Sequence, residues 1–201
     1  MATPKQMVKL MQIFCEVPTE QLQDVLESGF LADLRDANIS QINREDFRRI
    51  CGLISKSSVT HTSTITVDET KTVEDLTAEG KYKWSNSDVT SEKFPRPENG
   101  TRSERKIALF HFGKEMTSEQ VIAEMDKEGF RQATIHELLA LGIAQPELQK
   151  DFPIISLGSV CVLNGRRLVA ILYENAGYRG LRLSWFDLGW SGHCRFVGVR
   201  K

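Results

Sequence analysis

Two helix start signals follow one another in the middle of the chain, at Thr117-Ser-Glu-Gln120 and at Thr134-Ile-His-Glu137. In each, a threonine is followed three residues later by Gln or Glu. This is the capping-box pattern, in which the two side chains satisfy each other's free backbone N–H groups. Gly129 and Gly142 stand where each helix would end, because glycine adopts the left-handed conformation that closes helices. The pattern predicts two adjacent helices between a preceding and a following set of strands.

The strands around this helix pair are predicted from their apolar runs. Lys106-Ile-Ala-Leu-Phe-His-Phe112 precedes the pair, and after Pro153 the spacing of apolar residues becomes strand-like. Asn164-Gly165 is a strong hairpin signal, because both residues tolerate positive φ. Two loops rich in small and polar residues, 174–180 and 187–193, separate the last strands. The predicted strands are 106–112, 154–157, 160–163, 167–173, 181–186 and 194–199, which gives an α+β protein.

The first part of the chain has a different pattern. Apolar residues at helical spacing predict helices over 5–15, from Thr19 to Phe30 and from Asn43 to Leu53. Residues 55–79 are rich in Ser and Thr, which suits a linker, although Thr64-Ile-Thr-Val67 could form a short edge strand. We therefore expect a helical N-terminal unit over 1–54, a linker over 55–79 and an α+β module over 80–201.

Composition excludes several classes of protein. The 201 residues include 26 basic and 27 acidic side chains and are 40% hydrophobic, which is typical of a globular protein and not of a fibre or a disordered tail. The apolar segment near the N-terminus is interrupted by Lys9 and Gln12, so neither a signal peptide nor a membrane span is predicted, and we expect a cytoplasmic location. The four cysteines are at least 33 positions apart, which favours buried, reduced thiols over a zinc module or a disulfide scaffold.

Charge is unevenly distributed along the chain. Residues 158–201 hold seven basic and two acidic side chains, whereas the preceding 157 residues hold 19 and 25. A basic segment suggests nucleic-acid binding, but its six arginines are dispersed among apolar residues. On a strand such as Leu181-Arg182-Leu183, this alternation is also typical of a half-solvated antiparallel sheet.

The sequence predicts no catalytic centre. It contains no glycine-rich phosphate loop, and its histidines (His61, His111, His136 and His193) lack the paired spacing of metal ligands. His193 and Cys194 are adjacent at the start of the last predicted strand, and neighbouring residues of a strand point to opposite faces, so the two could not act as a nucleophile and base. We expect a protein that is not an enzyme and that carries no cofactor or metal.

The stretch 173–194 instead has the composition of a binding surface. Rigid aromatic residues provide contact area at low entropic cost, and small polar residues adapt to a partner. Within the stretch, Trp190 is predicted to fill the core. The residues that we predict to contact a ligand are Tyr173, Asn175, Tyr178, Ser184, Phe186, Leu188, Gly189, Ser191, His193 and Cys194.

Three segments carry a resemblance to a known family. They are Phe130-Arg-Gln-Ala-Thr-Ile-His-Glu-Leu-Leu139, Leu157-Gly-Ser159 and the closing Trp190-Ser-Gly-His-Cys-Arg-Phe-Val-Gly-Val-Arg200. With the order of elements, they resemble the C-type lectin-like fold over about residues 80–201. More narrowly, they are similar to bacterial and viral members related to formylglycine-generating enzymes and to the variable proteins of diversity-generating retroelements.

The branches of that family imply different functions. Sugar-binding members use a calcium loop and a Trp-Asn-Asp triplet, to which Trp185-Phe-Asp187 is the nearest match, and the formylglycine branch needs two closely spaced cysteines that this chain lacks. The retroelement branch implies a non-catalytic protein with a hypervariable binding face on a fixed scaffold, and a protein ligand. The alternative is an intracellular nucleic-acid-associated or regulatory protein that uses the arginine-bearing C-terminal sheet.

Overall fold

The computed structural model describes residue 12 and residues 18–29 and 58–201, and it divides the chain into two compact units, 1–56 and 57–201. In the first unit, helix α2 (Thr19–Glu27) matches the predicted second helix and starts after Pro18, without a side-chain cap. The helices predicted over 5–15 and from Asn43 to Leu53 lie outside the described residues, apart from residue 12. No helix among the described residues is long and apolar enough to cross a membrane.

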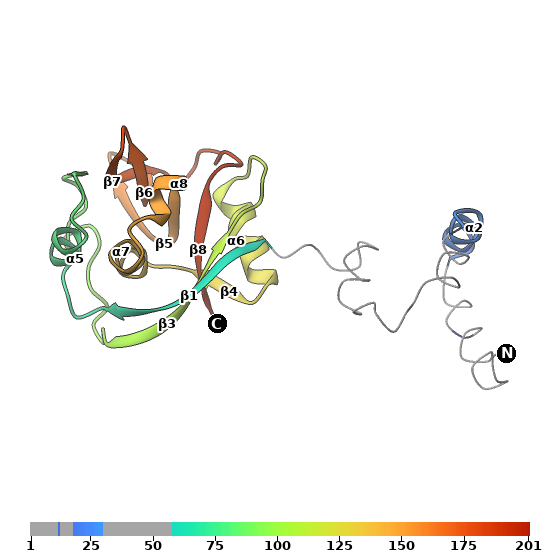
Figure 1. Cartoon of the computed structure of the whole chain (residues 1–201), viewed down its shortest axis with the longest axis horizontal. Helices are drawn as coiled ribbons and strands as arrows, with labels where there is room; N and C mark the ends of the chain where they lie inside the picture. The colour runs from blue at the N-terminus through green and yellow to red at the C-terminus, as the bar shows by residue number, and fades with distance from the viewer. Residues whose placement is uncertain (1–11, 13–17, 30–57) are drawn as a thin grey trace. The chain divides into compact units, whose positions relative to one another are not determined.

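The second unit is a mixed α+β module built on one large, mostly antiparallel sheet (Figure 1). The strands lie in the order β1-β3-β8-β5-β6-β7-β2, and β4 pairs with β8 off this path. Two short pairings, β5 with β8 and β2 with β7, are parallel. The strands are β1 (Val59–Asp68), β2 (Trp84–Ser85), β3 (Arg102–Phe110), β4 (Phe130–Gln132), β5 (Ile154–Leu163), β6 (Arg166–Asn175), β7 (Tyr178–Trp185) and β8 (Arg195–Arg200).

Helices cover both faces of the sheet and divide the core in two. On one face, α5 (Val73–Glu79) and α7 (Ile135–Ala144) pack on a cluster that we call the α7-side core, which includes Val67, Leu138 and Leu172. On the other face, α6 (Ser118–Lys127) and the β7–β8 connection pack on the α6-side core, which includes Met125 and Phe196. A four-residue helix, α8 (Leu148–Asp151), follows α7.

Both predicted capping boxes are confirmed. The Thr117 hydroxyl accepts the Gln120 N–H at 3.3 Å, and the Gln120 side chain accepts the Thr117 N–H at 3.0 Å. Thr134 and Glu137 make the same reciprocal pair at the start of α7. Gly129 has a φ of +79°, which fits its predicted role after α6.

The predicted role of Gly142 as the end of α7 is wrong, because the helix continues to Ala144. Gly142 is instead a packing residue. A Cβ atom there would lie 2.3 Å from the Tyr82 hydroxyl and 2.8 Å from Leu172, so only glycine lets these neighbours approach the helix.

Several strands differ in extent from the prediction. Segments 154–157 and 160–163 form one strand, β5, which has an irregularity between Ile155 and Val160. Asn164 and Gly165 both have positive φ, which confirms the predicted hairpin turn. The predicted loop 174–180 is a tight turn as well, because Ala176 and Gly177 have positive φ and β6 and β7 extend to Asn175 and Tyr178.

The segment expected to be a linker, 55–79, contains ordered elements in the structure. Strand β1 pairs with β3 over most of its length, and α5 follows with a capping box at Thr72 and Asp75. Threonine suits a linker by polarity, but its β-branched side chain also favours strands. Alternate residues of β1, including Ile65 and Val67, are buried, which ties the strand to the core.

Candidate binding face

The β6–β7 hairpin places several predicted site residues on one face of the sheet. Tyr173 is directly opposite Gly180, and Val169 is opposite Ser184. Directly opposed residues share a face, and positions two apart on a strand do so as well. Tyr173, Tyr178, Arg182 and Ser184 therefore project from the face that carries the α6-side core.

Gly180 creates the space in which the Tyr173 ring lies. A Cβ atom at position 180 would be only 2.4 Å from that ring, so the tyrosine lies directly across β7. The Arg182 guanidinium then stacks over the same ring, 5.2 Å from its centroid. The result is a flat aromatic and cationic surface beside the hairpin turn.

Two adjoining hollows border this surface, with volumes of about 340 and 620 Å³. Both are lined by Trp84, Tyr173 and Asn175. Trp84 is 51% exposed and Tyr178 is 58% exposed, with the Lys83 ammonium 5.7 Å from the Tyr178 ring. We call Trp84, Tyr173, Asn175, Tyr178 and Arg182 the hairpin face.

The backbone beneath the hairpin face is held from the opposite side of the sheet. The Gln149 side-chain amide, 1% exposed, donates to the carbonyls of Tyr173 at 2.7 Å and Gly180 at 3.1 Å. Arg179 donates to Gln149, and also to the carbonyls of Gly80 at 2.8 Å and Gly142 at 2.6 Å. Sequence reasoning missed both residues, since neither belongs to a motif and their partners are distant in the chain.

The β7–β8 connection supplies a second exposed surface. Leu188 is 50% exposed, and Gly189, Ser191 and His193 are exposed too. We call these four residues the loop face. Ser184 is half-buried at the end of β7 that leads into this connection.

Three residues of the same connection point inward. Phe186, Trp190 and Cys194 are 5%, 6% and 8% exposed and belong to the α6-side core. The Trp190 indole donates to the Ser118 hydroxyl at 2.8 Å, which in turn donates to the Phe186 carbonyl at 2.6 Å. Trp190 fills the core as predicted, whereas Phe186 and Cys194 offer little surface to a ligand.

The predicted site residues thus form two patches and not one. Tyr178 and Trp185 are the two ends of β7, seven residues apart, and a strand rises about 3.3 Å per residue. The tip of the hairpin face and the start of the loop face are therefore separated by about 23 Å along the strand. A ligand that contacts both patches must span about this distance.

Every arginine of residues 158–201 stacks on an aromatic ring. The guanidinium carbons lie 4.2 to 5.2 Å from the ring centroids. The pairs are Arg166–Trp185, Arg167–Phe186, Arg179–Tyr82, Arg182–Tyr173, Arg195–Phe152 and Arg200–Phe130. Arg167 also pairs with Asp187 and with Glu119, and these partners raise its pKa. One face of each guanidinium in this segment is therefore covered by a ring, and two carboxylates offset the charge of Arg167.

Glu137, His136 and Tyr82 are titratable groups on the α7 side of the sheet. Glu137 is fully buried and accepts two hydrogen bonds from Arg131, at 2.6 and 2.9 Å, which raise the pKa of that arginine. Burial lowers the pKa of His136 and raises the pKa of Tyr82 to about 12. These groups hold α7 and its neighbours in place and do not belong to the exposed faces.

The histidines and cysteines that the sequence singled out do not come together as catalytic pairs among the described residues. Cys194 is buried and His193 is exposed, so the adjacent pair does not form a nucleophile and base. His111 bonds to the Gly192 carbonyl at 2.8 Å, and Cys161 and Cys194 are free, buried thiols. Among residue 12 and residues 18–29 and 58–201, no three His, Cys, Asp or Glu side chains gather where they could hold a metal ion.

Comparison with known proteins assigns no relative to this chain. No protein-family model matches it, and searches among curated proteins and among solved structures found no similar protein.

Proposed function

We propose that this protein binds a macromolecular ligand, most simply a protein, through the hairpin face and the loop face, without catalysis. The observation that carries the proposal is the contrast within 173–194, where exposed aromatic and small polar residues alternate with residues locked into the core. Such alternation lets surface side chains vary while the backbone keeps one conformation.

The scaffold that we propose is C-type lectin-like. A strand, two capped helices and a set of antiparallel strands follow in the order of that fold, and the last strand, β8, pairs with β3, the strand that precedes the helix pair. This closure of the chain on itself supports the proposal. The resemblance of the closing segment to the variable proteins of retroelements further suggests that Leu188, Gly189, Ser191 and His193 are positions of diversity.

The composition of the two patches favours a protein ligand. Tyr and Trp supply large contact areas with few rotatable bonds, and Ser, Gly and Asn supply adaptable hydrogen bonds. The hairpin face offers the exposed Trp84 and Tyr178 as anchors, beside Tyr173 stacked under Arg182, and the loop face offers small and polar groups around Leu188. The wide, open hollows also suit a contoured protein surface better than an enclosed small molecule.

The nucleic-acid alternative has less support. Phosphate binding needs cations that are free to replace counterions, and aromatic rings on which bases can stack. Here the arginines of the C-terminal sheet already cover rings, and Arg167 is neutralised by two carboxylates. Trp84 and Tyr178 remain exposed, so a direct test is worthwhile.

That test is titration of the full chain with a single strand and a duplex of about 20 nucleotides at low and moderate salt. We expect no saturable binding at about 200 mM salt. Saturable binding that weakens steeply, by about 1,000-fold between 50 and 200 mM salt, would contradict the protein-ligand proposal and favour nucleic acid.

The DNA that flanks the gene tests the diversification part of the proposal. An imperfect copy of the 3′ coding end that differs at adenines, beside a reverse transcriptase gene, is the expected finding. If no such copy exists, the diversification part fails, while binding through the two faces remains testable by the variants described below.

A further inference from the structure

Strand β1 has one edge without a strand partner in the described part of the chain. It ends the strand order and pairs only with β3. The Glu69 N–H donates to the Thr101 carbonyl, and residues 69 and 101 are opposite in the register, so the backbone of Glu69 faces β3. Because this direction alternates along an antiparallel strand, the N–H and C=O groups of residues 62, 64, 66 and 68 face the free edge.

These backbone groups form a continuous row. No hydrogen bond to them is found among residues 58–201. The side chains at the same positions are Thr62, Thr64, Thr66 and Asp68, of which the threonines are exposed. Natural proteins protect long edges with lysine, proline or a covering segment, and this row carries no lysine or proline.

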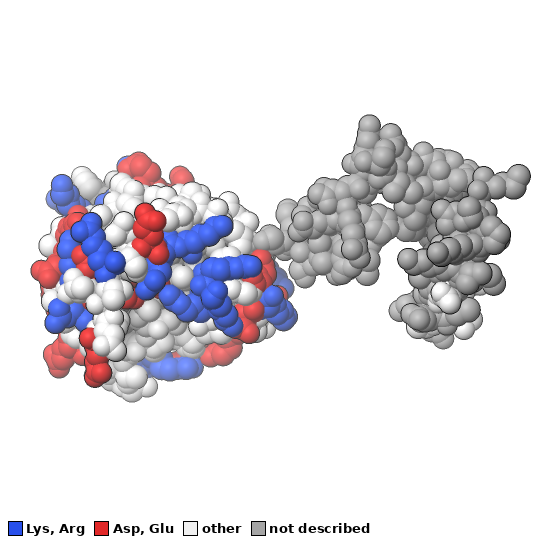
Figure 2. All heavy atoms as spheres, turned by 90° about the horizontal axis from the view of Figure 1, so that it is seen from below, with Lys and Arg blue, Asp and Glu red and all other residues white. Residues whose placement is uncertain are grey.

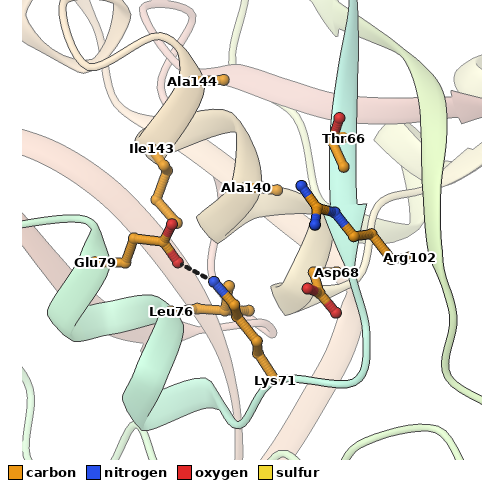
Figure 3. A pocket seen from close by; sticks show the side chains of 9 residues that line it. All are labelled: Thr66, Asp68, Lys71, Leu76, Glu79, Arg102, Ala140, Ile143 and Ala144. Atoms are coloured by element: carbon orange, nitrogen blue, oxygen red, sulfur yellow. Dashed lines mark hydrogen bonds and ion pairs between the residues drawn. The ribbon is translucent and has the colours of Figure 1, made fainter.

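A pocket of about 320 Å³ adjoins this edge at Thr66 and Asp68, near the end of β1 (Figure 3). Its floor is apolar, formed by Leu76 of α5 and by Ala140, Ile143 and Ala144 of α7. Thr66 also lines the pocket. One face of β1 packs on α7, and Thr66 projects from the other face. A pocket that touches both faces of an edge strand must lie at the edge itself, beside the free backbone groups.

Charged side chains line the rim of the pocket. The Lys71 ammonium donates to Glu79 at 2.7 Å, and Asp68 Oδ1 accepts the N–H and the hydroxyl of Thr70. Arg102, from β3, turns its guanidinium toward the pocket (Figure 3). Within the described residues Arg102 makes no hydrogen bond or close ion pair, and a longer-range attraction to Asp68 and a repulsion from Lys71 act on it. All of its guanidinium N–H donors are therefore unused within the described residues.

The outer surface of β1 and β3 carries charges of both signs (Figure 2). Figure 2 views the module from the side of these strands and shows basic side chains interspersed with acidic ones. Lys106 follows Arg102 on the outward face of β3, directly opposite Thr64 of β1. Arg102 and Lys106 therefore lie on the outer face of β3, beside the exposed side chains of β1, with Glu104 between them.

We propose that the free edge of β1 binds an extended peptide segment of a partner protein as an added strand, with small apolar and acidic residues in alternation. Successive side chains of an added strand point to opposite faces. The apolar ones would enter the pocket above Ala140 and Ile143, and the acidic ones would lie on the outer face, within reach of Arg102. This interface is separate from the hairpin face and the loop face.

The experiment uses the full chain and an end-blocked peptide of about eight residues that alternates valine and glutamate, a length matched to β1. Amide hydrogen exchange of Thr62, Thr64 and Thr66 is followed at millimolar peptide. We expect slowing of about tenfold or more at these amides, and none at the loop face. Absence of slowing at millimolar peptide would overturn the proposal.

Two N-methylated versions of the peptide test the strand geometry. One carries methyl groups on the odd residues and the other on the even residues, so only one of them loses the donors that face β1. We expect one version to bind like the parent and the other to fail. Equal behaviour of the two versions would contradict strand addition.

Protein variants give the matched controls. Thr64→Pro removes one free-edge N–H without removing a bond to β3, and Thr64→Val changes the side chain alone; only the proline variant should lose binding. Arg102→Gln should weaken the glutamate peptide about tenfold, whereas Lys127→Gln, which removes a charge on α6, should not. Slow exchange that depends on protein concentration without peptide would mean that a second copy occupies the edge, and would overturn the proposal.

Discussion

The two faces of the sheet differ in how their polar and aromatic residues are used. On the α7 side, several buried polar groups are held by hydrogen bonds: Glu137 accepts two from Arg131, and Gln149 and Arg179 tie α7 and α8 to β6 and β7. On the α6 side, aromatic residues alternate between core and surface, and the polar residues around them have few partners. The α7 side fixes the conformation of the backbone, and the α6 side exposes side chains carried by that backbone.

The comparison teaches where change should be tolerated. A buried, hydrogen-bonded charge cannot be altered without leaving its partners unsatisfied. Exposed side chains such as Ser191 and His193 are replaceable because the nearby Trp190 and Phe186 hold the connection in place. The following predictions rank substitutions on this basis.

The largest effect is expected for Glu137→Gln on the α7 side. Loss of the buried carboxylate leaves Arg131 without its bidentate partner and weakens the start of α7, so we expect a loss of about 3 kcal/mol in the free energy of unfolding. Urea denaturation measures it. Glu124→Gln, which breaks only the exposed pair with Lys127, is the matched control and should cost less than about 1 kcal/mol. Equal losses would refute the distinction.

Tyr82 should make stability depend on alkaline pH. Its pKa is raised from 10.0 to about 12 by burial, so the neutral form is favoured in the folded protein. The stabilisation is therefore complete below pH 10 and is lost as the pH rises from 10 toward 12, by about 1.4 kcal/mol per pH unit.

The Tyr82→Phe variant isolates this effect. The Tyr82 hydroxyl has no hydrogen-bond partner among the described residues, so its removal should change the free energy of unfolding little at pH 7. The difference between the two proteins in urea midpoint should then shift between pH 10 and 12 in favour of the variant. A constant difference over that range would show that Tyr82 titrates normally.

A smaller effect is expected for Gly180→Ala. The new methyl group would meet the Tyr173 ring, and relief of this overlap requires the ring to leave its position under Arg182. We expect a cost of about 1–3 kcal/mol and a changed tyrosine fluorescence. Gly177→Ala, at the turn with φ +84° but with no neighbour within 4 Å, is the control and should leave Tyr173 unmoved.

The smallest effect on stability is expected for the combined replacement of Ser184, Leu188, Ser191 and His193. These side chains are exposed or half-buried, so each change should stay within about 0.5 kcal/mol and thermal unfolding should be nearly unchanged. Ligand capture should change. A collapse of the fold would show that these residues support the core and would contradict their assignment to a binding face.

Local signals in the sequence were sufficient for much of the fold. The capping boxes and Asn164-Gly165 act within a few residues, so they predict the starts of α6 and α7 and the β5–β6 turn. The linker prediction over 55–79 failed because the pairing partner of β1 is β3, more than 30 residues away. Likewise, the role of Gly142 as a packing residue depends on its approach to Tyr82, which no local pattern reveals.

The binding face could be predicted only in part. Composition located the stretch 173–194, and the interior position of Trp190 was predicted. Composition could not separate Phe186 and Cys194 from their exposed neighbours, because the β7–β8 connection is irregular and lacks a period of two. The support from Gln149 and Arg179 was missed because it depends on carbonyl groups, which every residue has.

Two libraries in the same stretch test the central claim most directly. One randomises Ser184, Leu188, Ser191 and His193, and the other randomises their core neighbours Leu181, Phe186, Trp190 and Cys194. The fraction of members that resist a protease is measured for each. A fixed scaffold with a variable face predicts that most members of the first library and almost none of the second remain folded. Equal fractions in the two libraries would contradict it.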